Sequence, residues 1–131
     1  MKQAVASGQD SNLHLSWIES HSTSIGAPDL NYCYYGTHEW MELKCGPDID
    51  VRAAQVVWME DRIIAGGFPL FLIQYGDIYS IVPGSAAATL REEPHEENIL
   101  RHARAIWQGK LPADQLLRIM RNPRRIYERN S

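Results

Sequence analysis

Apolar and polar residues alternate in two parts of this chain, and each part predicts a pair of β-strands. Residues 30–35 (LNYCYY) and 38–44 (HEWMELK) are short, aromatic and alternating, with a glycine between them, as in a β-hairpin. Residues 69–75 (PLFLIQY) are almost wholly apolar, which is expected of a strand buried on both faces. A Gly-Asp turn then leads into residues 78–82 (IYSIV), which predict the fourth strand.

Apolar residues spaced three and four apart predict helices before, between and after these strands. A first helix is expected over residues 10–21, with a polar cap at its start. A second is expected over residues 51–65, capped by the preceding aspartate, and three more over residues 86–93, 98–109 and 113–122. The predicted core face of the second helix consists of Val51, Ala54, Val57, Trp58 and Ile64.

The order of these elements predicts the fold class. A strand, a crossover helix and a further strand indicate a mixed β-sheet of α/β type, flanked by helices. We expect a single domain over residues 1–131, because no long linker divides the chain. Its core is expected at about residues 10–84, and a helical, basic C-terminal extension at about residues 85–131.

Composition narrows the class of protein. The chain has 131 residues, of which 44% are hydrophobic and 22% charged, as in a soluble domain with one core. No apolar run reaches the roughly 20 residues of a transmembrane helix, and the N-terminus lacks a secretory pattern. We therefore expect a cytoplasmic protein that does not bind membranes, with Cys33 and Cys45 as reduced thiols.

Charge is distributed unevenly along the chain. Residues 1–97 carry a net charge of −9, whereas residues 98–131 carry +6, which together give the −3 of the whole chain. The positive segment can contact phosphates, or it can be a solvated counterpart to the acidic body. If it contacts nucleic acid, the contacting residues are expected to be Arg101, Arg104, Lys110, Arg118, Arg121, Arg124 and Arg125.

Candidate chemistry lies in the first predicted hairpin. Side chains alternate along a strand, so Glu42 and Lys44 share one face while Glu39 takes the other. Asp29 begins the preceding strand and lies across from Glu42 if the register allows. Two carboxylates and a backbone carbonyl, that of Leu43, form an oxygen-rich site suited to Mg²⁺ or Mn²⁺. A lysine beside such a site can orient water or stabilise charge on a phosphate.

Each of these residues also has a purely structural interpretation. Asp29 after a proline is typical of a turn, and Glu42 with Lys44 can be a surface ion pair worth less than about 1 kcal/mol. A zinc site made from the two cysteines and His38 is a further alternative. The sequence contains neither a nucleophile motif of GxSxG type nor a phosphate-binding GxxxxGK[ST] loop.

The order PD (Pro28, Asp29), a spacer, and then ExK (Glu42 to Lys44) resembles the PD-(D/E)xK nuclease superfamily. A helix glutamine, Gln55, and an apolar strand follow, which is similar to the VRR-NUC (virus-type replication–repair nuclease) branch. The similarity covers roughly residues 19–82.

The resemblance implies a restriction-endonuclease-like core and assigns a role to each matching residue. Asp29 and Glu42 would be metal ligands, and Lys44 the catalytic lysine. Glu19 would be a further ligand of the metal or its water, and Gln55 would orient the site.

The resemblance also implies an activity. We expect a Mg²⁺- or Mn²⁺-dependent nuclease that acts on DNA as a homodimer, with selectivity for branched substrates such as Holliday junctions or flaps. A small stand-alone nuclease of this kind is often phage-encoded. Two alternatives remain open: a catalytically inactive nuclease fold that binds nucleic acid or serves in assembly, and a hydrolase unrelated to nucleic acid.

Overall fold

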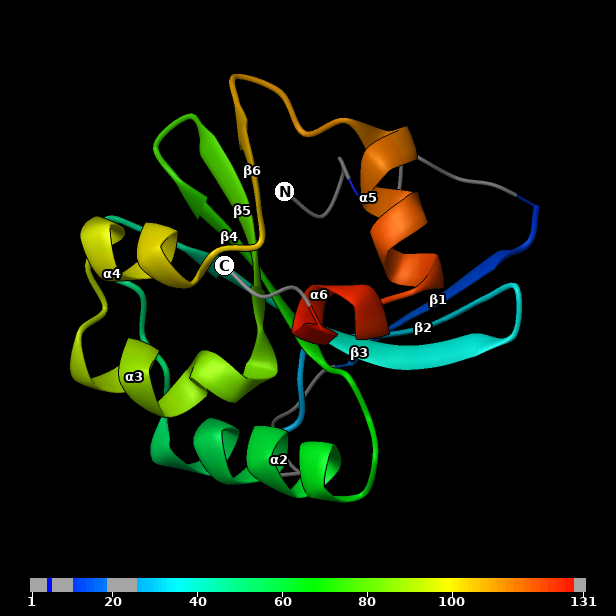
Figure 1. Cartoon of the computed structure of the whole chain (residues 1–131), viewed down its shortest axis with the longest axis horizontal. Helices are drawn as coiled ribbons and strands as arrows, with labels where there is room; N and C mark the ends of the chain where they lie inside the picture. Colours follow the sequence, from blue (N-terminus) through cyan, green and yellow to red (C-terminus); the bar gives the residue numbers. More distant parts are fainter. Residues whose placement is uncertain (1–4, 6–10, 19–25, 129–131) are drawn as a thin grey trace.

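The fold is described from a computed structural model that covers residue 5, residues 11–18 and residues 26–128. Within these residues the chain forms an α/β structure, in which a six-stranded mixed sheet is flanked by helices on both faces (Figure 1). None of the described helices is both long enough and apolar enough to cross a membrane.

The sheet is built in the order of the sequence. Its strands are β1 (Leu13–Trp17), β2 (Leu30–Tyr34), β3 (Thr37–Cys45), β4 (Leu70–Tyr75), β5 (Ile78–Pro83) and β6 (Ala105–Gln108). All neighbouring strands are antiparallel except β3 and β4, which are parallel and are joined by a crossover through helix α2 (Ala53–Ile64). Parallel neighbours need such a crossover because the chain must return to the same end of the sheet.

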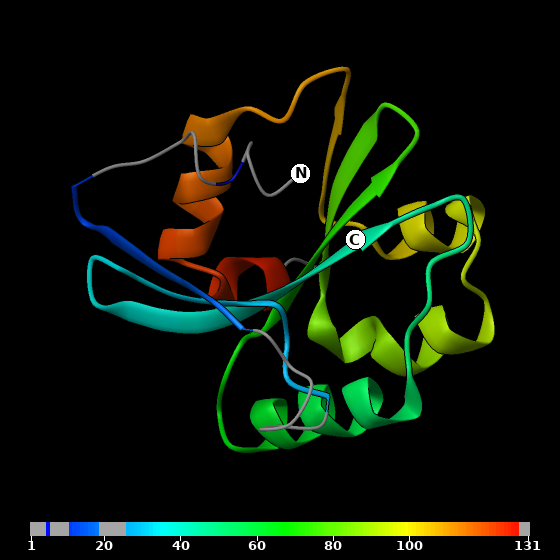
Figure 2. The same ribbon diagram turned by 180° about the vertical axis from the view of Figure 1, so that it is seen from behind.

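The remaining helices divide between the two faces. They are η1 (Gly84–Ala86), α3 (Ala87–Glu92), α4 (Glu96–His102), α5 (Ala113–Arg121) and α6 (Arg124–Glu128). Helices α2, α3 and α4 lie on one side of the strands, and α5 and α6 lie on the other (Figures 1 and 2). The sheet therefore has a hydrophobic core on each face.

Strand β4 separates the two cores and belongs to both. Leu70 and Leu72 pack in the core beneath α5 and α6, whereas Phe71 and Ile73 pack in the core beneath α2 to α4. All four are fully buried. The continuous apolar run of this segment is thus explained by burial on both faces, as the sequence predicts.

The helix predicted over residues 10–21 is wrong where the structure describes it. Residues 13–17 form strand β1, which pairs with β2. Leu13, Leu15 and Trp17 alternate with polar residues and pack against the core beneath α5 and α6. An alternating pattern of this length suits a half-buried strand, and the free edge of β2 supplies its hydrogen-bonding partner.

The helix predicted over residues 98–109 is wrong in its second half. Helix α4 ends at His102, and residues 105–108 form β6, the last strand of the sheet. The free edge of β5 offers backbone partners that local helical spacing cannot reveal, so tertiary pairing decides the conformation of this segment. The expected helical extension thus contributes one strand to the sheet, while the helices predicted over residues 86–93 and 113–122 are confirmed by α3 and α5.

Helix α2 is present as predicted, and Val51 and Trp58 pack in the core as expected, but the rest of its buried face differs from the expected one. Val57 and Ile64 are 56% and 84% exposed, whereas Gln55 and Met59 are buried. The N-cap is Arg52 rather than the predicted Asp50. The inward stripe is therefore rotated, and it places a polar glutamine in the interior next to β3.

Candidate metal and catalytic site

The register of the β2–β3 hairpin places Asp29 opposite Glu42. The paired residues run without interruption from Tyr34 with Thr37 to Leu30 with Met41. One further step outward brings Asp29 across from Glu42. Since no bulge interrupts the described pairing, the alternation predicted for this strand is confirmed: Glu42 and Glu39 point to opposite faces.

Two hydrogen bonds from backbone N–H groups to carboxylates connect the segment that carries Asp29 with strand β3. The backbone N–H of Asp29 donates to Glu42 Oε1 at 3.0 Å. The backbone N–H of Leu43 donates to Asp29 Oδ2, also at 3.0 Å. Each carboxylate thus accepts from the backbone of the opposing strand, which fixes both side chains and holds the two acids next to each other.

Lys44 and Gln55 converge on the second oxygen of Glu42. Lys44 Nζ lies 3.1 Å from Glu42 Oε2, and Gln55 Nε2 donates to the same oxygen at 2.7 Å. Lys44 Nζ also donates to Gln55 Oε1 at 3.0 Å and to the backbone carbonyl of Asp50 at 2.5 Å. Gln55 therefore links the acid to the lysine, and this explains why an amide is buried on the inward face of α2.

The environment of Glu42 shifts its titration. The residue is only 4% exposed, and loss of hydration is the main cause that raises the pKa of Glu42 from an ordinary 4.5 to about 7. The negative charge of Asp29 acts in the same direction, while Lys44 opposes both. A buried acid beside a second acid carries negative charge that a cation would neutralise, which is the electrostatic character of a metal site.

Gly26 brings the strand that carries Asp29 against the start of α2. A Cβ atom at Gly26 would lie 2.2 Å from the carbonyl oxygen of Ala54, and Gly26 has a φ of +86°. Only glycine tolerates both the close approach and this backbone conformation. Gly26 escaped the sequence-based predictions, although a glycine three residues before the candidate acid was a signal that could have singled it out.

The groups of Asp29, Glu42 and Leu43 that could ligate a cation are all oxygens. In a strand, the N–H and C=O groups of one residue point to the same side, so the carbonyl of Leu43 is directed toward the segment that carries Asp29, whose carboxylate accepts the Leu43 N–H. Two carboxylates and a carbonyl are the ligands that Mg²⁺ and Mn²⁺ prefer. Among the described residues, no group of three or more histidine, cysteine, aspartate or glutamate side chains is placed to hold a metal.

Two other sequence predictions, the Glu19 ligand and the zinc alternative, concern residues outside this pair of acids. Glu19 lies outside the described residues, so its expected role as a ligand stays a prediction. The zinc alternative does not come together, because Cys45 lies seven residues beyond His38 on the same strand, about 23 Å away.

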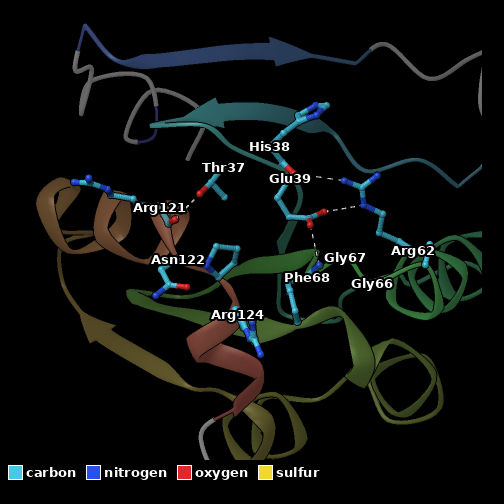
Figure 3. A pocket seen from close by; sticks show the side chains of 12 residues that line it. Thr37, His38, Glu39, Arg62, Gly66, Gly67, Phe68, Arg121, Asn122 and Arg124 are labelled. Carbon is cyan, nitrogen blue, oxygen red and sulfur yellow. Dashed lines mark hydrogen bonds and ion pairs between the residues drawn. The ribbon is translucent and has the colours of Figure 1, made fainter.

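The other acid of the hairpin, Glu39, has a structural role on the opposite face. Its Oε1 pairs with Arg62 Nε at 3.0 Å, and its Oε2 accepts the backbone N–H of Phe68 at 2.8 Å. Figure 3 shows this carboxylate turned toward Arg62 and Phe68, in a pocket of about 480 Å³. Glu39 thus ties β3 to the segment that follows α2.

The seven basic residues expected to contact nucleic acid do not form one surface. Arg101 and Arg124 each pair with a glutamate one helical turn away, and the guanidinium carbon of Arg121 lies 3.8 Å from the centre of the Tyr35 ring. Lys110 is exposed in the loop after β6. The other three line a groove beside β6: Arg104, Arg118 and Arg125.

Comparisons with known proteins assign no family. No protein-family model matches the chain, and a search of curated proteins finds no match.

Proposed function

We propose that this chain is a Mg²⁺- or Mn²⁺-dependent nuclease that hydrolyses phosphodiester bonds in DNA. This proposal rests on the convergence of four side chains: Asp29, Glu42, Lys44 and Gln55. These residues are spread over a segment of 27 residues, and the hairpin register and helix α2 bring them together. A decorative surface pair would not be buried, whereas Glu42 is 4% and Gln55 3% exposed.

The donor set fits the proposed cation. Asp29, Glu42 and the Leu43 carbonyl would hold it, and because burial raises the pKa of Glu42 to about 7, binding of the cation would be accompanied by loss of the Glu42 proton at neutral pH. When bound, a divalent cation lowers the pKa of water and neutralises charge on a phosphoryl oxygen.

The chain's own residues supply the rest of the proposed mechanism. Gln55 holds the Glu42 carboxylate in place through its 2.7 Å hydrogen bond. Lys44 is half-buried, with its ammonium next to that carboxylate, where it would orient the attacking water and stabilise the charge that develops on the phosphate. Asp29 is also half-buried, so these two side chains give the substrate access to the site.

The fold supports the finer part of the proposal. A hairpin carrying PD and ExK, a crossover helix carrying the glutamine, and a parallel apolar strand follow one another in the order that the resemblance to the nuclease superfamily implies. We extend the proposal to a homodimer with selectivity for branched DNA, such as four-way junctions or flaps. Two active sites related by a twofold axis would suit a substrate with two equivalent strands.

The experiment incubates the purified chain with flap, four-way junction, linear duplex and single-stranded DNA, with Mg²⁺, Mn²⁺ or EDTA. Asp29→Asn and Lys44→Gln are expected to lose cleavage by more than about 100-fold, in the range of lost electrostatic stabilisation of a transition state. The matched control is Asp77→Asn, at an exposed turn position between β4 and β5. Cleavage by both site variants at the wild-type rate would refute the proposal.

One observation favours a catalytically inactive nuclease fold as the second candidate. The ammonium of Lys44 has three donors, and it has three acceptors within the protein: Glu42, Gln55 and the carbonyl of Asp50. A lysine satisfied in this way can serve structure alone. Calorimetry decides between the two: the nuclease requires Mn²⁺ binding that Asp29→Asn abolishes, whereas the inactive fold binds DNA without binding the metal or cleaving.

A further inference from the structure

A groove of about 790 Å³ lies along strand β6, between that strand and helices α5 and α6. We call it the β6 groove. Its charged lining residues are Arg104, Asp114, Arg118 and Arg125, and its large apolar lining residues are Ile106, Trp107, Ile119 and Ile126. It is distinct from the Asp29–Glu42 site, which lies beside β3, beyond two intervening strands and on the face of the sheet that α2 covers.

The β6 groove is positive although the chain as a whole is negative. Three arginines and one aspartate give it a net charge of +2, against −3 for the chain. The guanidinium groups of Arg118 and Arg125 form no ion pair with any side chain in the described part of the chain, unlike those of Arg62, Arg101 and Arg124. Two cations are thus available in the groove for an anionic ligand.

The groove also offers apolar surface beside these cations. Ile119 of α5 lines the groove and is half-buried, so part of its side chain is open to the groove. The neighbouring Trp107 is partly buried, and its indole N–H donates to Gln115 Oε1 at 2.9 Å, which fixes the orientation of the ring. Cations next to apolar and aromatic surface match a ligand that presents phosphates and unpaired bases together.

We propose that the β6 groove binds a single-stranded segment of nucleic acid. Phosphates would lie against Arg118 and Arg125, and bases against Ile119 and the exposed part of Trp107. A duplex matches the groove less well, because its bases are stacked inside and cannot reach the apolar surface. The phosphodiester backbone supplies the charge complementarity that selects this ligand over a neutral peptide strand.

This inference rests on the proposed function in one respect, since the bound segment would be a single-stranded arm of the DNA that is cleaved. Ile106 is level with Lys44 across the sheet, because the pairing runs in one register through β4 and β5. The separation is three strand spacings, about 14 Å along the sheet. The groove lies on the face covered by α5 and α6, and the carboxylate site on the face covered by α2, so such an arm would pass around the edge of the sheet to reach the site.

The test measures binding of fluorescein-labelled oligo(dT) to the Asp29→Asn protein in EDTA, so that cleavage plays no part. The double substitution R118Q/R125Q is compared with R101Q/K110Q, which removes the same charge from the same segment outside the groove. We expect R118Q/R125Q to weaken binding about tenfold or more, and to reduce the slope of log K against log salt by about 1.4 for two lost phosphate contacts. The control pair is expected to change affinity less than threefold.

Three outcomes would overturn the inference. The first is an equal loss of oligo(dT) affinity in the two double variants. The second is duplex DNA bound as tightly as the single strand. The third is a change in the oligomeric state of R118Q/R125Q on size exclusion, with unchanged oligo(dT) affinity. The last would mark the groove as a contact between copies of the chain. Failure of the nuclease proposal is separate, because it appears as cleavage that Asp29→Asn and Lys44→Gln leave unchanged.

Discussion

Replacing Asp29 by asparagine should make the metal-free protein more stable while abolishing its metal response. Asparagine keeps an oxygen that accepts the backbone N–H of Leu43, which Asp29 Oδ2 accepts at 3.0 Å. The substitution removes the negative charge next to Glu42 and introduces an N–H₂ group that can donate to it. The change is therefore isosteric and exchanges a repulsive contact for an attractive one.

The pKa of Glu42 sets the size of the effect. That pKa is raised from 4.5 to about 7, first by burial and then by the charge of Asp29. An acid whose pKa is raised on folding does not lower the free energy of unfolding below its unfolded pKa, where it is protonated in both states. The free energy of unfolding then falls as pH rises from the unfolded pKa to the folded pKa. The whole shift corresponds to on the order of 3 kcal/mol lost between pH 4.5 and pH 7. If Asp29→Asn lowers the pKa of Glu42 by one unit, the free energy of unfolding at pH 8 rises by about 1.4 kcal/mol.

The assay is urea denaturation in EDTA at pH 8 and pH 4.5, for wild type, Asp29→Asn and the exposed control Asp77→Asn. At pH 8 we expect Asp29→Asn to gain about 1.4 kcal/mol, or about 4 °C in Tm, and at pH 4.5 the gain should nearly vanish. The control should stay within about 0.5 kcal/mol at both pH values. Mn²⁺ should then stabilise wild type and the control but not Asp29→Asn.

Two results would refute this reasoning. An Asp29→Asn protein that is less stable than wild type at pH 8 would mean that Asp29 does not destabilise the ionised form of Glu42. Stabilisation by Mn²⁺ equal to that of wild type would mean that the ion, if it binds, does so away from this pair.

Four further predictions concern the same hairpin and its support. Mn²⁺ affinity should fall as pH decreases below about 7, since Glu42 must release its proton to bind the ion; calorimetry that finds equal affinity at pH 6 and pH 8 would contradict this. Gly26→Ala should destabilise the protein by about 3 kcal/mol and reduce cleavage. Gly36 also has a positive φ, but no atom lies near the position of its Cβ, so Gly36→Ala should cost about 1 kcal/mol. Equal losses of stability in thermal melts would refute the role of the close approach at Gly26. Glu39→Gln should lower the free energy of unfolding by about 2 kcal/mol in urea denaturation yet leave Mn²⁺ binding intact. Loss of Mn²⁺ binding in this variant would mean that the metal site lies on the face of β3 that carries Glu39. Gln55→Met should lose about 2 kcal/mol because Glu42 and its neighbours lose buried partners, and an unchanged urea midpoint would show that the amide is dispensable.

Much of the candidate site could be predicted from the sequence because its residues are close in the chain. Alternation along β3 places Glu42 and Lys44 on one face whatever the rest of the fold does. The hairpin needs only a tight turn to bring Asp29 across from Glu42, and the uninterrupted apolar run of β4 indicates a strand buried on both faces. These features follow from local geometry, with side chains alternating and strands joined by short connections.

The tertiary structure decided the features that depend on partners distant in sequence. Residues 13–17 and 105–108 are strands because the edges of β2 and β5 offered unpaired backbone groups, which local helical spacing cannot reveal. Gln55 is buried in place of Val57 because hydrogen bonds to Glu42 and Lys44 offset the cost of removing an amide from water.

The sequence by itself therefore determined the strands of the hairpin, the identity of its two acids and lysine, and the helix that follows. Only the folded chain decided which side of α2 faces the sheet, that Glu42 loses its hydration, and that three of the seven basic residues gather beside β6. The physical reason is that periodicity fixes directions along one element, whereas burial and charge at a site are set by the elements packed against it.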